Sequence, residues 1–500
     1  MRVLLVRPPL FQVNFSLGIF PLGLYSQFMT RYPPLGMMYL ASLLRRDGHE
    51  VAFIDAEGEN LESESVIARM RPFAPELLVG NINVYNSYRN ILDMITINNA
   101  FDVPLIVRGH FPSAYADETM SHPEIDYALT GKGFTSLAPL VRRIADGREP
   151  NDVGGVRFRR NAKVIDTGPE APLADMDDLP FPARDLVDNR LYTTNLTYRR
   201  PFTTMFASLG CPFDCAYCQD RVVPFIARSA SNVLDEIQEC VQRYGIREIT
   251  FLDPTFTIKR QWVLDICRGI VERGLDVSYT IRTRPDLLDE EMLALLAASG
   301  CVRISIGIET GDPELMAKIH RKITPEQIKP AIELIRRHGI MAFGYFMVGI
   351  PGESHRSLQN TLDFVRELPL DFAQFLLTVP TLHSEIWEYN SKLLNKDIWR
   401  EIHYGRYPTP DEFRCRETEL TLPEIDRWTN RLYRAFYLDS ARWRSLLRMK
   451  FLPGYVRRQF EIAGTIVAQT ILRFIRRRFP TFLLLRYPFA RNGGPGSPRR

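Results

Sequence analysis

The sequence predicts an α/β protein with an N-terminal doubly wound, Rossmann-like domain, a partial (β/α)6 barrel of the TIM type and a helical C-terminal region. Three observations predict this fold class. Short apolar segments alternate with helical segments from residue 3 to about 145, and the alternation resumes at residue 203 before a mainly helical pattern begins near residue 385. The chain has 500 residues, beyond the roughly 250 to 300 at which a single core stops growing, so several domains are expected.

The first domain is predicted over residues 1–146 as an open, parallel sheet with helices between its strands. Strands are expected at residues 3–6, 50–54, 76–80, 103–107 and 125–129, and helices include 35–47 and 136–145. In such a sheet, ligands bind at the carboxyl ends of the strands. These ends are Arg7–Pro9, Asp55, Asn81–Tyr85 and Gly109–Pro112.

Residues 147–200 are rich in Pro, Gly, Asp and Arg and are predicted to form a linker, with a short strand pair around 155–166. The partial barrel is predicted over 201–384, with its site at the carboxyl ends of its strands. Its strands are expected at 203–208, 248–252, 277–283, 302–308, 341–348 and 372–379, and its helices at 232–244, 260–274, 289–299, 325–338 and 354–368. Residues 385–490 are predicted to be helical and 491–500 disordered.

Composition and targeting signals predict a cytoplasmic globular protein. Hydrophobic residues make up 45% of the chain and charged residues 24%, as in ordinary globular domains. The apolar run that ends at Arg7 is too short for a signal peptide, and no window reaches the roughly 18 apolar residues of a spanning helix. Seven cysteines, three of them within eight positions, suit a reducing compartment and a metal site better than a disulfide framework.

The net charge of +4 is unevenly distributed. Residues 440–500 carry 14 Arg or Lys and one acid, Glu461, which leaves the rest of the chain acidic. Apolar residues alternate with these arginines, a composition typical of interfacial helices, so a peripheral membrane contact through residues 440–490 is the first interpretation. A helical cap on the barrel and RNA binding are the alternatives, with nucleic acid the least favoured.

The densest functional signal is Gly210-Cys211-Pro212-Phe213-Asp214-Cys215-Ala216-Tyr217-Cys218, which directly follows the first strand of the barrel. Three thiolates on one tight loop can hold three irons of a [4Fe–4S] cluster and leave the fourth iron open for a small ligand. Zinc is the competing interpretation, but structural zinc favours four ligands in paired spacing, and no histidine lies nearby in the sequence. The metal ligands are therefore predicted to be Cys211, Cys215 and Cys218.

This loop, with an aromatic residue before its last cysteine, resembles the signature of the radical S-adenosylmethionine (SAM) enzymes. The resemblance implies that SAM chelates the open iron, that an electron from the cluster cleaves the sulfonium, and that a 5′-deoxyadenosyl radical abstracts a substrate hydrogen. It also implies an electron donor of the flavodoxin or ferredoxin type. Residues matching the family's SAM contacts are Tyr217, Asp253, Arg282, Glu309 in SIGIET and Gly349 in GYFMVGIPGES, while Arg284 is a weaker candidate.

A doubly wound domain before this signature resembles the cobalamin-binding members of the family, over roughly residues 1–440. The matching segments are VLLVRPP, PPLGMMYLASLLRRDGHEV and IDYALTGKGF, and they imply cobalamin contacts at Pro9, Asp55, Gly109, Gly131 and Gly133. No Asp-x-His-x-x-Gly is present, which implies base-off binding without a histidine ligand. Departures from the family pattern at 108–112 and 131–134 leave open a domain that no longer binds cobalamin, and His110 is either a ligand contact or a loop residue.

Among the other cysteines, Cys240, Cys267 and Cys301 are expected to be buried packing residues. Cys415 lies between Arg414 and Arg416, and two guanidinium groups are expected to lower its pKa and favour the thiolate. Cys415 is therefore a candidate catalytic acid or hydrogen donor.

The resemblance implies a methyltransferase that acts on an unactivated carbon, and the tail adds the expectation of a lipophilic substrate. Radical oxidation or ring cyclisation, as in the anaerobic porphyrin cyclases of similar layout, is the alternative within the enzyme class. A non-catalytic partner protein that keeps the cluster for structure or sensing is the alternative outside that class.

Overall fold

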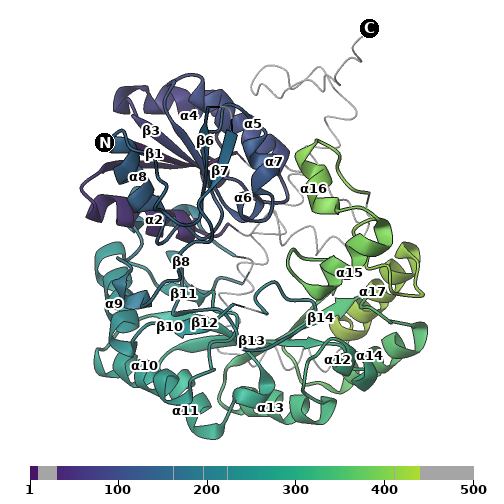
Figure 1. The fold of residues 1–500 in the computed structure, drawn as a ribbon. Coiled ribbons are helices and arrows are strands. Elements are labelled where there is room, and N and C mark those ends of the chain that lie inside the picture. The colour runs from purple at the N-terminus through teal and green to yellow at the C-terminus, as the bar shows by residue number, and fades with distance from the viewer. Residues whose placement is uncertain (10–30, 162, 195, 222, 410, 440–500) are drawn as a thin grey trace, which may run out of the picture. The chain divides into compact units, whose positions relative to one another are not determined.

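A computed structural model describes residues 1–9, 31–161, 163–194, 196–221, 223–409 and 411–439 (Figure 1). The chain divides into two units, Met1–Lys450 and Phe451–Arg500, and every described residue belongs to the first. The predicted basic tail (440–490) and disordered end (491–500) lie outside the described residues.

The first sheet has seven strands in the order β2-β1-β3-β4-β5-β6-β7. The strands are β1 (Arg2–Arg7), β2 (Glu50–Asp55), β3 (Leu77–Asn81), β4 (Leu105–Arg108), β5 (Tyr127–Leu129), β6 (Val156–Arg160) and β7 (Lys163–Asp166). The central residues of β1 are apolar and fully buried, as in a parallel strand covered on both faces. The doubly wound expectation is confirmed, with the β2-β1-β3-β4-β5 order of flavodoxin-like folds.

One part of the expectation is corrected, because this sheet is mixed and not wholly parallel. Strands β6 and β7, predicted as a strand pair inside a linker, pair antiparallel with β5 and with each other. The pattern of residues 156–166 predicted the two strands but carried no information about the edge that they would join. The segment 147–166 therefore extends the first sheet.

Helices lie on both faces of this sheet (Figure 1). They are α2 (Leu35–Arg46), α3 (Ala56–Glu59), α4 (Ser63–Met70), α5 (Ser87–Asn98), α6 (His110–Ala114), α7 (Ala116–Met120) and α8 (Leu137–Ala145), with a 3-10 turn at Arg71–Phe73. Two separate apolar cores result, one with α2 and α8 on one face and one with α5, α6 and α7 on the other.

The second sheet has six strands, all parallel, in the order β15-β14-β13-β12-β11-β8. They are β8 (Phe202–Met205), β11 (Glu248–Phe251), β12 (Ser278–Thr283), β13 (Cys301–Glu309), β14 (Met341–Val348) and β15 (Phe372–Leu377). A short antiparallel pair, β9 (Ser208–Leu209) with β10 (Ile226–Ala227), follows β8. The partial barrel is confirmed, and consecutive strands lie side by side because each connection is a right-handed helical crossover.

The helices of the barrel end near their predicted limits because capping residues stop them. They are α9 (Ala230–Tyr244), α10 (Arg260–Glu272), α11 (Glu290–Ala298), α12 (Pro313–Lys318), α13 (Pro325–Arg337) and α14 (His355–Glu367), with a 3-10 turn at Pro285–Leu287. The Ser229 hydroxyl caps the start of α9, and Gly245 ends it in the left-handed conformation. Thr324 and Gln327 form a capping box at the start of α13.

The interdomain segment contains 3-10 turns at Met176–Asp178, Arg184–Leu186 and Asn189–Leu191, and the second of them contributes Arg184 to a buried ion-pair network. The Arg184 guanidinium lies 2.6 Å from a Glu236 carboxylate oxygen on α9, and Arg228 pairs with the other oxygen of the same carboxylate. Arg184 also donates to the carbonyl of Thr204 on β8 at 2.9 Å. All three charged side chains are at least 97% buried, so this network joins the interdomain segment to the barrel.

The C-terminal region contains α15 (Glu385–Leu394), α16 (Ile398–His403) and α17 (Leu422–Tyr437). Helix α17 packs on α14 and β15, and α16 contacts α5 of the first domain. Trp399, Ile402 and Phe413 belong to the same apolar core as β1 and α5. The region therefore touches both sheets. In the part of the chain that the structure describes, no helix is long and apolar enough to cross a membrane.

Candidate active site

The three predicted metal ligands lie on residues 210–225, called the cysteine loop below, which joins β9 to β10. Gly210 begins it with φ +74°, and a Cβ there would lie 2.2 Å from the Pro224 carbonyl oxygen, so the turn needs glycine. Cys215 is buried, whereas Cys211 and Cys218 are partly exposed. Three thiols on one loop, at the carboxyl end of the first barrel strand, are a donor set that fits a cubane with one open iron.

No group of three His, Cys, Asp or Glu side chains within the described ranges is placed to hold a single metal ion. Two backbone hydrogen bonds of the loop involve the cysteines. Cys211 N donates to Val223 O at 3.2 Å, and Cys218 N donates to Cys215 O at 3.0 Å.

Tyr217 and Glu309, chosen from separate motifs, are in direct contact. The Tyr217 hydroxyl donates to Glu309 Oε1 at 2.9 Å, and Thr381 holds the Tyr217 carbonyl at 2.9 Å. Glu309 ends β13 with φ +70°, a conformation that a non-glycine residue rarely adopts. Burial raises the pKa of the Glu309 carboxyl above its usual value, while Arg321 acts in the opposite direction. A polar pair with a strained backbone at a strand's carboxyl end is typical of a ligand-binding edge.

Asp253 follows β11 and has no exposed surface. Its carboxylate accepts from Ala207 N at 3.1 Å and from the Ser208 hydroxyl at 2.5 Å. Burial raises the pKa of Asp253 to about 6. Because these bonds hold the residues that lead into the cysteine loop, Asp253 stabilises the base of that loop.

Two other predicted SAM contacts lie at the same edge. Arg282 is the penultimate residue of β12 and is partly exposed. Gly349 follows β14 with φ +84°, and its N–H donates to the Glu353 carboxylate. Burial raises the pKa of Glu353 to about 8. Glu353 was not predicted, and its place in the Gly-Glu-Ser segment after the strand is the signal that could have found it.

The side chain of Arg284 packs against the cysteine loop. Its guanidinium bonds both oxygens of Asp286 at 3.0 Å and stacks on the Phe213 ring at 4.0 Å from the centroid. These contacts give Arg284 a structural role, and its contact with SAM stays a prediction.

Sequence reasoning missed Arg321, which is 5% exposed and lies between Glu309 and the cysteine loop. Its Nη1 donates to Cys215 Sγ at 3.8 Å, and its Nη2 donates to the Gly307 carbonyl. Nothing in Lys318-Ile319-His320-Arg321-Lys322 distinguishes one buried arginine from a basic surface turn.

At the first sheet, the predicted cobalamin contacts Pro9 and Asp55 lie at the carboxyl ends of β1 and β2. Asp55 is 2% exposed and accepts from Gly58 N at 2.9 Å and from the Tyr192 hydroxyl at 2.8 Å. Arg7 adds an ion pair at 3.4 Å. Asp55 is thus the N-cap of α3 and part of a buried network, and its cobalamin contact stays a prediction.

Three glycines form the other part of this edge. A Cβ at Gly109, where φ is +129°, would lie 2.2 Å from the Ile82 carbonyl oxygen. Gly133 has φ +80°, its N–H donates to Glu170 at 3.2 Å, and a Cβ at Gly131 would collide with the same carboxylate. Glycines give an edge at which backbone can approach a ligand closely. A corrin carries peripheral amides that such backbone groups can bond, so the edge fits this cofactor.

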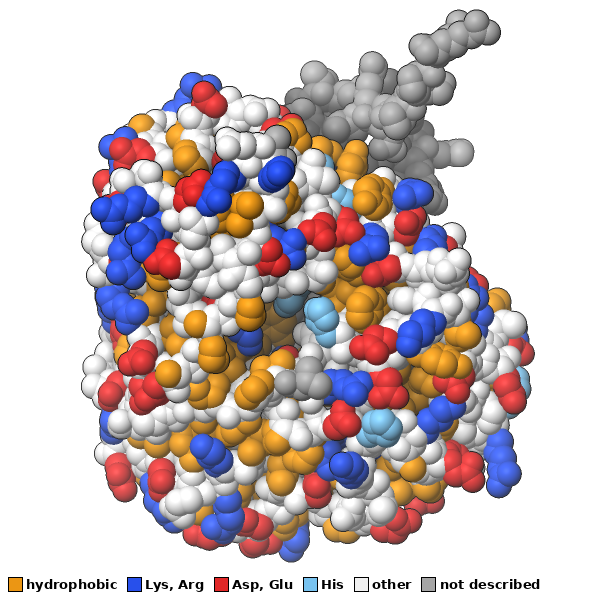
Figure 2. Space-filling model, viewed as in Figure 1, with side chains coloured by type: hydrophobic (Ala, Val, Ile, Leu, Met, Phe, Trp, Pro, Cys, Tyr) orange, Lys and Arg blue, Asp and Glu red, His pale blue; other side chains and the backbone are white. Residues whose placement is uncertain are grey.

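His110 lies at the carboxyl edge of β4, and its side chain is exposed. Desolvation by nearby protein atoms lowers the pKa of its imidazole, and the positive charge of Arg108 lowers it further. Asp220 of the cysteine loop and His383 are also close enough to influence that pKa. The segment after β15 joins the two edges, because Thr381 donates to the Tyr217 carbonyl at 2.9 Å while Leu382 packs in the same apolar core as Phe111. Figure 2 shows a face of the molecule that is hollowed at its centre, with hydrophobic and histidine side chains around the hollow.

The expectation that the pKa of Cys415 is lowered is wrong. Its thiol has no exposed surface, and burial raises its pKa to about 11. Both neighbouring guanidinium groups pair with Asp411, Arg414 at 3.0 Å and Arg416 at 2.8 Å. Burial therefore favours the thiol form although Arg414 acts in the opposite direction, and the catalytic role of Cys415 stays a prediction.

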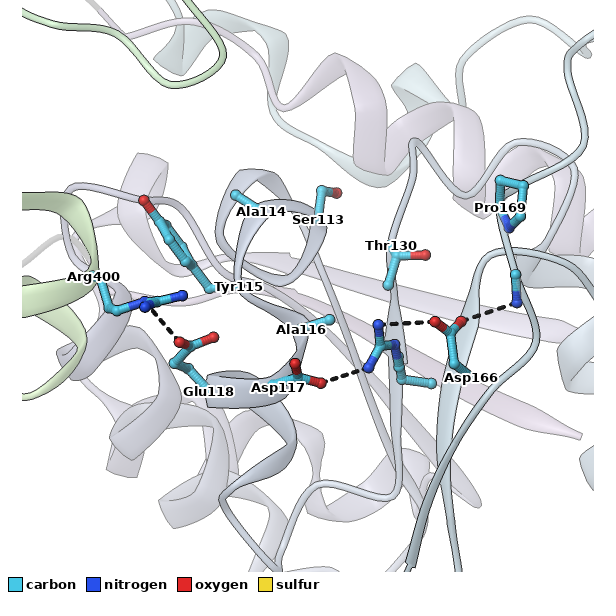
Figure 3. A pocket seen from close by; sticks show the side chains of 12 residues that line it. Ser113, Ala114, Tyr115, Ala116, Asp117, Glu118, Thr130, Asp166, Pro169 and Arg400 are labelled. Atoms are coloured by element: carbon cyan, nitrogen blue, oxygen red, sulfur yellow. Dashed lines mark hydrogen bonds and ion pairs between the residues drawn. The ribbon is translucent and has the colours of Figure 1, made fainter. Parts of the chain in front are cut away.

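A pocket of about 350 Å³ lies on the first domain, and its lining residue Ser113 donates to the carbonyls of Gly109 at 2.8 Å and Gly131 at 3.4 Å (Figure 3). It is bordered by residues 113–118, β6, β7 and Arg400 of α16. Its charges are paired, with Arg400 bonding Glu118 at 2.8 Å and Arg157 bonding Asp166 at 2.9 Å. No predicted site residue lines it.

Two family models match the chain. The model of the radical SAM superfamily matches residues 205–365, which include the cysteine loop, Asp253, Arg282 and Glu309. The model of the B12 binding domain matches residues 24–141, which include Asp55 and the three glycines.

Two curated relatives and one solved structure match most of the chain. An uncharacterized methyltransferase of Pyrococcus horikoshii is 29% identical over 89% of this chain and 94% of its own length. An anaerobic magnesium-protoporphyrin IX monomethyl ester cyclase of Rubrivivax gelatinosus is 26% identical over 78% and 70%. The radical SAM methyltransferase TsrM of Kitasatospora setae, solved with cobalamin and a [4Fe–4S] cluster, superposes with a TM-score of 0.62 at 20% identity, over 78% of this chain and 75% of that chain, which shows the shared fold.

Proposed function

Since the chain is a B12-binding radical SAM enzyme, related to class B methyltransferases and anaerobic Mg-protoporphyrin cyclases, we propose that it methylates an unactivated carbon of a lipophilic small molecule. A [4Fe–4S] cluster, SAM and cobalamin are the cofactors typical of this family. When bound, they supply the electron that cleaves the sulfonium of SAM and a methyl group that can be transferred.

Residues of the barrel hold the cluster and SAM. Cys211, Cys215 and Cys218 bind three irons and leave the fourth to SAM. Tyr217 and Glu309, already hydrogen bonded at 2.9 Å, contact its sugar or amino acid part. Arg282 pairs with a carboxylate or bonds ribose oxygens. Asp253 fixes the base of the cysteine loop and faces the amino group, and backbone at Gly349 lines the adenine.

The first sheet holds cobalamin through backbone more than through charge. Gly109, Gly131 and Gly133 let the chain approach the corrin, while Pro9 and Asp55 end the two neighbouring strands. No histidine of the Asp-x-His-x-x-Gly type is available as a lower ligand, so we expect base-off binding.

The observation that carries the proposal is the meeting of the two edges. Thr381, after β15, donates to the Tyr217 carbonyl of the cysteine loop at 2.9 Å, and its neighbour Leu382 belongs to the apolar core that contains Phe111, just after β4. Methyl transfer to a carbon needs the methyl source and the site of hydrogen abstraction to reach one substrate, and this arrangement gives both from one hollow. The hydrophobic side chains around that hollow favour an apolar substrate (Figure 2).

The basic tail supports a lipophilic substrate. Residues 440–490, outside the described residues, combine apolar and basic residues as interfacial segments do. We propose that they hold the enzyme at an anionic membrane surface. Flotation with anionic liposomes should recover the full chain but not a chain that ends at residue 439, and equal flotation of the two would contradict the membrane contact.

A reductant of the flavodoxin or ferredoxin type is the expected protein partner, because each cleavage of SAM consumes one electron. The test below uses a chemical reductant in place of this partner, so the radical reaction can be measured before the protein partner is known.

The test uses SAM with a deuterated methyl group and an extract of hydrophobic small molecules. Methylation predicts a product heavier by CD3, with S-adenosylhomocysteine and 5′-deoxyadenosine formed in equal amounts. A Cys215→Ala chain, which lacks one cluster ligand, should form neither nucleoside product. Formation of 5′-deoxyadenosine alone, across all reductants and extracts, would overturn methylation.

That last outcome would favour the second candidate, radical oxidation or cyclisation, which the Rubrivivax gelatinosus relative supports. A cyclase should make 5′-deoxyadenosine without S-adenosylhomocysteine and should transfer no deuterium from the methyl group. A tetrapyrrole ester is the first substrate to try, because that relative's name gives one.

A further inference from the structure

The turn that follows α12, residues 319–322, is fastened to the cysteine loop at three points. Ala216 N of the loop donates to Ile319 O at 3.1 Å. Arg284 Nη1 donates to Arg321 O at 3.1 Å, while the same guanidinium stacks on Phe213 of the loop. The third point is the side chain of Arg321. This turn and the cysteine loop therefore form one unit, although Cys215 and Arg321 are 106 residues apart in the sequence.

The Arg321 guanidinium is fixed against a cysteine sulfur. Its Nη1 donates to Cys215 Sγ at 3.8 Å, and its Nη2 donates to the Gly307 carbonyl. A Cβ on Gly307 would lie 3.0 Å from Nη2 and 2.3 Å from Glu309 Oε1, so the guanidinium and the carboxylate both pack directly over this glycine. The side chain thus has little freedom to leave Cys215.

The backbone of the turn is shaped to deliver this contact. His320 and Lys322, on either side of Arg321, have φ of 56° and 49°. Such conformations cost free energy in residues other than glycine and persist where the surroundings impose them. A surface arginine needs no such turn, whereas one that must enter a buried site does.

We propose that Arg321 is a positioning residue that donates an N–H···S hydrogen bond to Cys215 and raises the reduction potential of the cluster. Reduction by one electron adds a negative charge to a cluster held by three thiolates. A buried cation and a hydrogen bond to a ligand sulfur both stabilise that charge. The inference rests on the proposed assignment of the cluster to the three cysteines.

The test is a potentiometric titration of the reconstituted full chain, followed by the EPR signal of the reduced cluster. Arg321→Gln removes the charge, and we expect at least a tenfold lower ratio of reduced to oxidised cluster at a fixed potential, which is a shift of about 59 mV to more negative values. Arg321→Lys restores the charge and should return the potential toward that of the wild type. Lys322→Gln removes an exposed charge from the same turn and should shift the potential much less.

A second measurement does not depend on a variant that folds. In wild-type protein labelled with 15N-arginine, pulsed EPR should detect a coupling between the reduced cluster and a 15N nucleus. The Lys322→Gln variant should retain this coupling. An iron-replete Arg321→Gln chain with an unchanged potential would overturn the proposal, and so would a labelled wild type without the coupling. Failure of the cluster assignment is distinguishable, because wild-type protein would then lack four irons and the EPR signal.

Discussion

The two edges that meet at the hollow are built from different materials. At the barrel edge, side chains contact one another, as with Tyr217 on Glu309, Arg321 on Cys215 and Asp253 on Ser208. At the edge of the first sheet, backbone and glycine dominate, and the carboxylate of Asp55 is hydrogen bonded to Gly58 and Tyr192. The difference teaches that the barrel edge is sensitive to loss of a functional group, whereas the edge of the first sheet is sensitive to loss of space.

The largest effect should come from the cysteine loop. Changing Cys215 to alanine removes a predicted cluster ligand, so iron should fall from about four per chain to near zero and SAM cleavage should disappear. Cobalt binding should persist, because the first edge is built separately. Cys240→Ala, a buried cysteine on α9, is the control and should keep its iron. Loss of cobalt together with iron in Cys215→Ala would contradict the independence of the two edges.

The next largest effect should come from the network that joins the interdomain segment to the barrel. Glu236→Gln leaves Arg184 and Arg228 buried without a counter-charge, which should lower the free energy of unfolding by about 3–5 kcal/mol. Glu239→Gln, on the same helix, breaks a surface pair with Arg243 and should cost about 0.3–0.5 kcal/mol. Denaturant unfolding of the pair checks this, and equal losses would show that the buried network contributes nothing special.

A backbone change should affect the first edge alone. Gly109→Ala places a methyl group against the Ile82 carbonyl at a φ of +129°, and we expect cobalt affinity to fall about 10- to 100-fold with iron unchanged. Gly147→Ala also falls at positive φ, but its Cβ meets nothing within 4 Å, so it measures backbone strain by itself. Cobalamin titration by absorbance compares them. Full cobalt affinity in Gly109→Ala would show that this edge does not bind the corrin.

The smallest effect should come from removing one hydrogen bond at the barrel edge. Tyr217→Phe keeps the ring but loses the bond to Glu309, which is worth about 1 kcal/mol, so SAM cleavage should slow by up to about tenfold. Tyr389→Phe, at an exposed position, is the control. If the Tyr217→Phe enzyme cleaves SAM at the wild-type rate, the Tyr217 hydroxyl has no part in SAM cleavage.

The sequence predicted the fold and the barrel edge well because both leave local signals. Apolar runs of strand length located each strand of the barrel, and the cysteine spacing identified the loop before its neighbours were known. Tyr217 and Glu309, 92 residues apart, were assigned to one site because both match motifs of the radical SAM family, and the structure brings them into contact.

Other features were beyond reach because they depend on tertiary neighbours. Nothing in residues 156–166 specifies that β6 pairs with β5. The pKa of Cys415 rises because the core buries the thiol, and that burial is not visible in Arg-Cys-Arg. Arg321 looks like a surface residue until the turn is seen to bring it to Cys215.

Metal analysis of anaerobically purified and reconstituted protein tests the central claim that one chain holds a cluster and cobalamin at facing edges. The account predicts iron near four and cobalt near one per chain, with the absorbance of base-off cobalamin. Iron near four with no cobalt retained after reconstitution would contradict it, because the first edge would then have lost the cofactor on which methyl transfer depends.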